Sequence, residues 1–161
     1  MVLLVGISSE MGGNVPDDAI IFIMELFTTS FPYIVFSGFV PLALLFLRIT
    51  LAIMFLDSGR RHLQDPTARA ASLGLSKTLT IVIGLVEVIG GFLILIGLWT
   101  HYAAFFLSGV MVGAIYFKMF VWKTGIYGQR NDGWYYDALL LAGTGILFAI
   151  GAGELALDAW L

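Results

Sequence analysis

The chain has 161 residues, the length of one ordinary domain, yet its composition excludes the soluble class. Hydrophobic residues make up 60% of it and charged residues only 12%, whereas a typical soluble domain has about 25% charged residues. The net charge of −3 argues against nucleic-acid binding, which needs a clustered basic surface. The absence of cysteine excludes disulfides, iron–sulfur clusters and thiolate zinc sites.

The first forty residues contain one apolar stretch, residues 20–27, which Glu25 interrupts. Polar residues and Pro32 then end the apolar pattern. We expect this region to form a helix that lies at the membrane interface, or a half-inserted hairpin. The alternative is an additional membrane span over residues 19–39.

Four later segments are apolar and long enough to cross the hydrocarbon core, which needs about 20 residues. They cover residues 41–58, 77–99, 102–122 and 134–153. Each is expected to be a helix, because lipid offers no hydrogen-bond partners to exposed backbone groups. The sequence therefore predicts an all-α membrane protein, in which a bundle of four transmembrane helices over residues 41–161 follows an N-terminal interfacial or half-inserted helix.

Basic residues predict the orientation of this bundle in the cell membrane. They are concentrated in two connections: Arg60, Arg61, Arg69 and Lys77 in the first, and Lys123 and Arg130 in the second. The N-terminal region, the turn near Thr100 and the C-terminus contain no Lys or Arg. The positive-inside rule then places loops 59–77 and 123–133 in the cytoplasm and both termini outside.

Two ionisable residues, Arg48 and Glu87, lie deep within predicted spans, where a charge costs about 2.5–3.5 kcal/mol on insertion scales. Counted from Arg60 and Lys77 at about 1.5 Å per residue, both lie roughly 15–18 Å from the first basic loop. This matching depth predicts an Arg48–Glu87 pair. The pair either fixes the register of two helices or lines a ligand cavity.

For Lys118 near the end of the third span and Asp137 near the start of the fourth, one interpretation is a contact between the two side chains. The alternative for Lys118 is to extend toward lipid headgroups. The second span has small residues such as Gly84 and Gly91 on one stripe, and the third has Gly109 and Gly113. We interpret both stripes as helix-packing surfaces.

The two histidines do not suggest a metal site. His62 falls in the first basic loop and His101 in the turn after the second span, on opposite faces of the membrane. This separation, together with the lack of cysteine, excludes a bis-histidine haem and predicts no metal. Any redox chemistry would therefore use a lipid-soluble or borrowed cofactor.

Several short motifs occur in a characteristic order: LRITL at 47–51, FLDSG at 55–59, EVIGG at 87–91, GLWT at 97–100 and GWYYD at 133–137. In order and spacing, over about residues 42–158, they resemble the DoxX family of small four-helix membrane proteins. The resemblance implies the four-helix fold and a redox setting, because the related DoxD subunit belongs to a thiosulfate:quinone oxidoreductase. Residues 1–40 exceed the usual family length, which suggests a segment that docks on a partner.

We therefore expect an integral membrane subunit of a quinone-linked redox complex, either respiratory or of the thiosulfate:quinone oxidoreductase type. A quinone would be contacted by Arg48, Glu87, Lys118 and Tyr116. The first alternative is a non-catalytic accessory subunit of a larger respiratory complex. The second is a small-solute pathway, for which four short helices leave room only in a homo-oligomer. The sequence defines no catalytic residue and no reaction.

Overall fold

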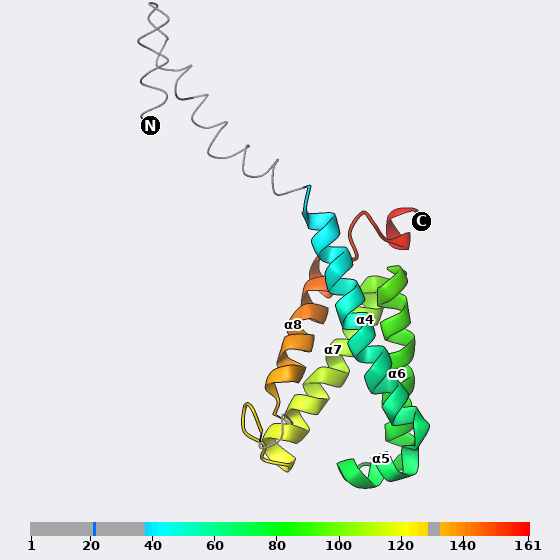
Figure 1. The fold of residues 1–161 in the computed structure, drawn as a ribbon, viewed down its shortest axis with the longest axis vertical. Coiled ribbons are helices and arrows are strands. Elements are labelled where there is room, and N and C mark those ends of the chain that lie inside the picture. Colours follow the sequence, from blue (N-terminus) through cyan, green and yellow to red (C-terminus); the bar gives the residue numbers. More distant parts are fainter. Residues whose placement is uncertain (1–20, 22–37, 129–132) are drawn as a thin grey trace, which may run out of the picture. The chain divides into compact units, whose positions relative to one another are not determined.

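The computed structural model describes residue 21 and residues 38–128 and 133–161. The expected N-terminal helix and the alternative span over residues 19–39 therefore lie almost entirely outside the described residues. The chain divides into two compact units, Met1–Val40 and Pro41–Leu161, and the second contains nearly all of the described residues. All regular secondary structure in the described part of the chain is helical, as the sequence predicts (Figure 1).

The second unit consists of four principal helices and three short ones. In chain order they are α4 (Val40–Gln64), α5 (Pro66–Leu73), α6 (Lys77–Ile96), α7 (Thr100–Tyr116), the π-helix η2 (Phe117–Val121), α8 (Tyr135–Ile150) and the 3-10 helix η3 (Leu157–Ala159). α4, α6 and the continuous α7–η2 helix are long and apolar enough to cross a membrane. α8 is apolar but has only 16 residues, so the fourth span remains a prediction.

The bundle has two distinguishable ends (Figure 1). We call the end that carries α5 and the 122–134 connection the loop end. The opposite end, with the α6–α7 turn and the C-terminal segment 151–161, is the turn end. In Figure 1, α4 and α6 separate from α7 and α8 toward the loop end.

The first helix is longer than expected, and the following connection is itself partly helical. α4 continues six residues beyond the predicted end at Ser58, to Gln64. Asp65 then caps α5 by accepting a hydrogen bond from the Ala68 nitrogen, and Pro66 occupies its first turn. Gly74, in the left-handed conformation, ends α5. These turn and cap residues were visible in the sequence, but the basic charge of the segment led us to interpret it as a loop.

Glycines bring α4 and α6 into close contact. A Cβ atom added to Gly59 would lie 2.8 Å from the Gly84 carbonyl oxygen, and one added to Gly84 would lie 2.9 Å from the His62 Cβ. At the next level, a Cβ on Gly91 would lie 3.2 Å from the Phe55 Cβ. The packing interpretation of the small-residue stripe in the second span is therefore confirmed.

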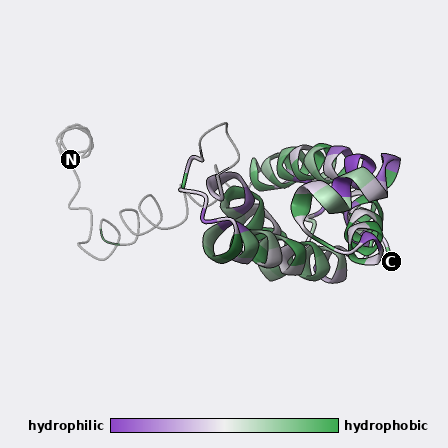
Figure 2. Ribbon diagram, turned by 90° about the horizontal axis from the view of Figure 1, so that it is seen from below, coloured by the Kyte–Doolittle hydropathy of each residue, from purple (hydrophilic) through white to green (hydrophobic). Residues whose placement is uncertain are grey.

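Apolar side chains fill the interior of the bundle and also cover its outside. The interior includes Leu51, Phe55, Ile94, Leu107 and Leu147, all at most 3% exposed. Among the large apolar side chains that remain exposed on the helices are Phe46, Ile53, Phe92, Phe105 and Leu139. Viewed along the bundle in Figure 2, hydrophobic colouring accordingly reaches the outer sides of the helices. Such a surface fits lipid and not water.

Candidate ligand cavity

A cavity of about 470 Å³ lies toward the loop end, among α4, α5, α6, α7, η2 and α8. Its volume is within the roughly 300–1,000 Å³ range of small-molecule sites. Most of the wall is apolar, and it includes Phe55, Ile83, Val86, Phe106, Val110 and Leu140. Five residues with acidic or basic side chains also line it: His62, Arg69, Glu87, Lys118 and Asp137. An apolar chamber with a few converging polar groups is the usual form of a ligand site.

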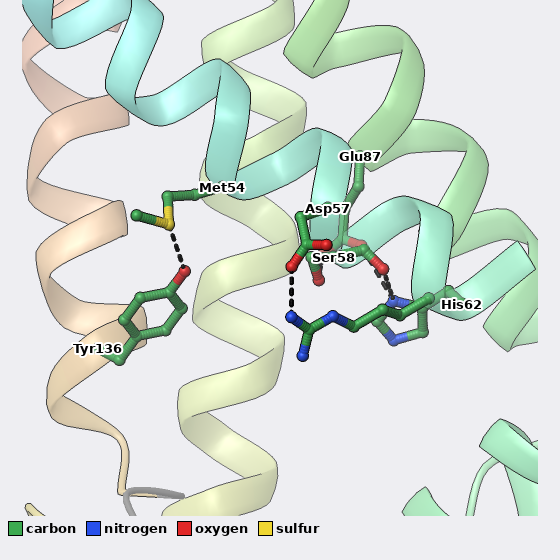
Figure 3. A network of polar contacts seen from close by, with 7 residues as sticks. Met54, Asp57, Ser58, His62, Glu87 and Tyr136 are labelled. Carbon is green, nitrogen blue, oxygen red and sulfur yellow. Dashed lines mark hydrogen bonds and ion pairs between the residues drawn. The ribbon is translucent and has the colours of Figure 1, made fainter.

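Glu87, in the middle of α6, points toward α4 (Figure 3) and is only 2% exposed. The Ser58 hydroxyl donates a hydrogen bond to its Oε1 atom at 3.1 Å. The His62 Nδ1 atom lies 3.1 Å from Oε2 and 3.0 Å from the Ser58 carbonyl oxygen. Since the Ser58 carbonyl can only accept, we infer that Nδ1 carries a proton and donates it there. Oε2 is then close to His62 but has no aligned hydrogen-bond donor.

Lys118 and Asp137 form a second pair across the cavity wall. The Lys118 Nζ atom lies 2.6 Å from Asp137 Oδ2 and donates to the Gly133 carbonyl oxygen at 3.3 Å. Asp137 is 6% exposed, so the ion pair stabilises a carboxylate that would otherwise be buried alone. Of the two alternatives for Lys118, the structure shows the contact with Asp137. Lys118 belongs to η2, and π-helical turns are frequent at functional sites.

Sequence reasoning missed two residues of the cavity. His62 was assigned to a loop, and Arg69 was considered only as a topology signal. Arg69 extends from α5, and its buried Nε atom has no hydrogen-bond partner. The available signal was that no proline lies between Ser58 and Pro66. The helix α4 can therefore continue through this segment, which places Ser58 and His62 on one face of it.

Gly109 and Gly113 have a different role from the glycines of α6. A Cβ atom added at either position would meet nothing within 4 Å, and both residues line the cavity. Our packing interpretation of the stripe in the third span is therefore wrong. Because glycine has no side chain, these two positions leave space in the cavity that a larger residue would fill. Gly109 is also exposed, so the cavity reaches the outer surface of the bundle at this point.

The predicted Arg48–Glu87 pair does not form. Arg48 lies at the turn end, 2% exposed, and donates hydrogen bonds only to backbone carbonyls. These are the carbonyls of Ile94 at 2.9 Å, Leu95 at 2.7 Å, Leu155 at 2.8 Å and Ala152 at 3.4 Å. Glu87 instead contacts Ser58, ten residues or about 15 Å further along α4. Counting residues from Arg60 gave the wrong depth for Arg48, because α4 continues beyond Arg60. Equal distances from Arg60 and Lys77 therefore did not correspond to equal depth in the bundle.

Tyr116 lies outside the described lining of the cavity. It is 56% exposed, and its ring packs against Phe120 with a centroid distance of 5.2 Å. Of the four residues expected to contact a ligand, the structure thus brings Glu87 and Lys118 together in one cavity. It places Arg48 at the opposite end and Tyr116 on the outer surface of the bundle.

Comparison with known proteins identifies the family. The DoxX family model matches residues 43–121. An uncharacterized protein from Haemophilus influenzae is 34% identical over 122 residues, which cover 73% of this chain and 90% of that protein. The chain belongs to the DoxX family. The DoxX match includes His62, Arg69, Glu87 and Lys118, whereas Asp137 lies beyond it. No solved structure matches the chain.

Proposed function

We propose that this DoxX-family protein is a membrane subunit of a quinone-linked redox complex and binds the quinone headgroup in the cavity at the loop end. The observation that carries the proposal is the presence of two buried acid–base pairs, His62–Glu87 and Lys118–Asp137, in one largely apolar chamber. A quinone headgroup needs apolar walls for its ring and polar partners for its two oxygens.

The proposed route of entry is from the lipid. Quinones are carried in the bilayer, and the cavity reaches the outer surface at Gly109, where the neighbouring apolar helix surface suits the hydrocarbon tail. Our ligand set retains Glu87 and Lys118 and adds His62 and Arg69. Arg48 has no such role in the proposal, because backbone carbonyls already occupy its guanidinium group.

The proposed membrane arrangement follows from the charges. We infer that α8 is the fourth span, although its 16 residues extend only about 24 Å. A short span is accommodated by local thinning of the bilayer. The basic residues of loops 59–77 and 123–133 favour a cytoplasmic location of the loop end, which would place the cavity in the cytoplasmic half of the membrane.

The alternative function is that of a non-catalytic accessory subunit. It is favoured by the division of the chain at Val40, because the first unit lies wholly ahead of the DoxX match, and a segment outside the family match is a candidate for contact with other subunits. A solute pathway past Arg48 and Glu87 gains no support, since the two residues lie at different levels of the bundle.

The test is ligand binding by the full chain in lipid nanodiscs. Trp122 lines the cavity, so a bound quinone should quench its fluorescence. We expect saturable quenching by ubiquinone-1 that is lost on Trp122→Phe substitution. Gly113→Leu should fill the cavity and weaken binding at least tenfold, whereas Gly145→Leu should not, because Gly145 also has open space around it but lies outside the lining. Equal binding by the two leucine variants, or no quenching at all, would reject the proposal.

A further inference from the structure

The side-chain atoms that lack hydrogen-bond partners gather at this cavity. Among the described residues, four buried polar atoms have no partner: Arg69 Nε, Glu87 Oε2, Thr100 Oγ1 and Asp137 Oδ2. Three of them belong to residues that line the cavity. Asp137 Oδ2 is compensated by the Lys118 ammonium group at 2.6 Å. Glu87 Oε2 likewise faces His62 Nδ1 at 3.1 Å, but a carboxyl oxygen has two lone pairs and can accept a further hydrogen bond from a ligand, and Arg69 Nε, a donor, has no partner.

The surroundings of Glu87 Oε2 make this atom a hydrogen-bond acceptor. His62 Nδ1 carries a hydrogen, because it lies 3.0 Å from the Ser58 carbonyl oxygen, which only accepts. A hydrogen on Glu87 Oε2 would face this N–H group at 3.1 Å. Oε2 therefore carries no hydrogen and can accept one from a ligand, while Oε1 contacts the Ser58 hydroxyl at 3.1 Å.

An acceptor at Glu87 Oε2 distinguishes the two redox forms of a quinone. The oxidised form offers only carbonyl oxygens, which are acceptors, and one placed against Glu87 Oε2 would make no hydrogen bond and be repelled. The reduced form carries two hydroxyl groups, each of which can both donate and accept. A hydroxyl can donate to Glu87 Oε2, and a hydroxyl oxygen can accept from Arg69 Nε.

We propose that the cavity binds the reduced quinol in preference to the oxidised quinone, with Glu87 as the residue that makes this distinction. The inference rests on the proposed function, since it concerns which form of the ligand occupies that site. It adds that this subunit receives quinol from a reaction that reduces quinone, and that it binds the oxidised form less tightly.

The experiment compares ubiquinol-1 with ubiquinone-1 in nanodiscs under anaerobic conditions, using Trp122 quenching or competition between the two forms. We expect the wild-type protein to bind ubiquinol-1 at least tenfold more tightly. For a two-electron couple, a tenfold ratio raises the midpoint potential of the bound ligand by about 30 mV. In Glu87→Gln the side-chain amide can donate to a carbonyl, so the preference should shrink at least tenfold or reverse.

Asp57→Asn is the matched control. It makes the same carboxylate-to-amide change one residue before Ser58, but Asp57 pairs with Arg61 and is not among the residues that line the cavity. This variant should retain the wild-type ratio. If Glu87→Gln fails to fold, the wild-type ratio still decides whether quinol is preferred.

The possible outcomes separate the two proposals. If neither form binds, the proposed function fails and the inference fails with it. If both bind equally, or the oxidised form binds more tightly, the proposed function stands and the quinol preference is wrong. If Glu87→Gln keeps the full preference, Glu87 is not the residue responsible.

Discussion

Asp158 caps the helix that begins at Thr100, although 58 residues separate the two in sequence. Its carboxylate oxygens accept hydrogen bonds from the backbone nitrogens of Trp99 at 2.7 Å and Thr100 at 2.9 Å. The Asp158 nitrogen in turn donates to the Gly97 carbonyl oxygen at 2.8 Å. These bonds hold Trp99 in the left-handed conformation, with φ of 48°, and tie the C-terminal segment to the α6–α7 turn.

Removal of this cap should destabilise the turn end. Asp158→Ala leaves the Trp99 and Thr100 nitrogens without their acceptor, and loss of a helix N-cap costs about 0.5–2 kcal/mol. We expect a corresponding fall in the midpoint of thermal unfolding in detergent. Asp158→Asn, which keeps one acceptor oxygen, should lose less. Identical midpoints for the wild-type protein and Asp158→Ala would show that the cap contributes nothing.

The same cap predicts a pH dependence. Burial alone raises the pKa of Asp158, but the hydrogen bonds from Thr100 and Trp99 outweigh that effect and hold the pKa below its ordinary value of 3.8. The stabilisation is therefore present above about pH 3.8 and is lost as the pH falls through the lower pKa of the folded protein. Thermal unfolding followed from pH 7 downward should show this loss in the wild-type protein and a smaller one in Asp158→Asn.

Arg48 should be required for stability. Arg48→Met removes the donor to the Leu95 and Leu155 carbonyls, at about 1–3 kcal/mol for each carbonyl left without a partner, whereas the Ile94 carbonyl keeps its hydrogen bond from the Gly97 nitrogen. Arg48→Lys should recover only part of this loss, because an ammonium group cannot reproduce the guanidinium fork. We expect low yields and early thermal unfolding for Arg48→Met. A variant with wild-type stability but impaired quinone binding would instead place Arg48 in the ligand site.

The Lys118–Asp137 pair can be measured by a double-mutant cycle. Lys118→Met should cost about 3–5 kcal/mol, because it leaves the buried Asp137 carboxylate unpaired. Adding Asp137→Leu should recover a large part of the loss, since no charge then remains buried. Additive effects of the two substitutions on the free energy of unfolding would mean that the pair is not coupled.

A glycine with close neighbours and a glycine with open space around it should respond in opposite ways to replacement by alanine. Gly84→Ala places a Cβ 2.9 Å from the His62 Cβ and should destabilise the protein by about 1–3 kcal/mol. Gly145→Ala meets nothing within 4 Å and should stabilise α8 by up to about 1 kcal/mol through helix propensity. Thermal unfolding of both variants under the same conditions provides the comparison.

Hydropathy was sufficient to locate the principal helices, because a membrane span is defined by its composition. α6, α7 with η2, and α8 each begin within two residues of the predicted segment. The Lys118–Asp137 contact was one of the two alternatives that the sequence left open for Lys118.

Contacts that depend on the register between helices did not follow from the sequence. Counting from Arg60 and Lys77 paired Arg48 with Glu87, but α4 continues four residues beyond Arg60, to Gln64, and Glu87 lies level with Ser58. The acceptors of Arg48 are backbone carbonyls, which any residue type supplies, so no sequence motif marks them. In the sequence, Gly109 and Gly113 also resemble packing glycines. Their spacing does not show whether the side chains of a neighbouring helix lie close to them.

The open space beside Gly109 and Gly113 has an evolutionary consequence. A glycine inside a helix costs about 1 kcal/mol relative to alanine, and here no close contact compensates for that cost. Selection for thermal robustness alone should therefore replace these two residues early, and the replacements would occupy the chamber that the proposed ligand needs. In a library of random variants, we expect the most heat-resistant clones to carry substitutions at 109 and 113 and to have lost quinone binding.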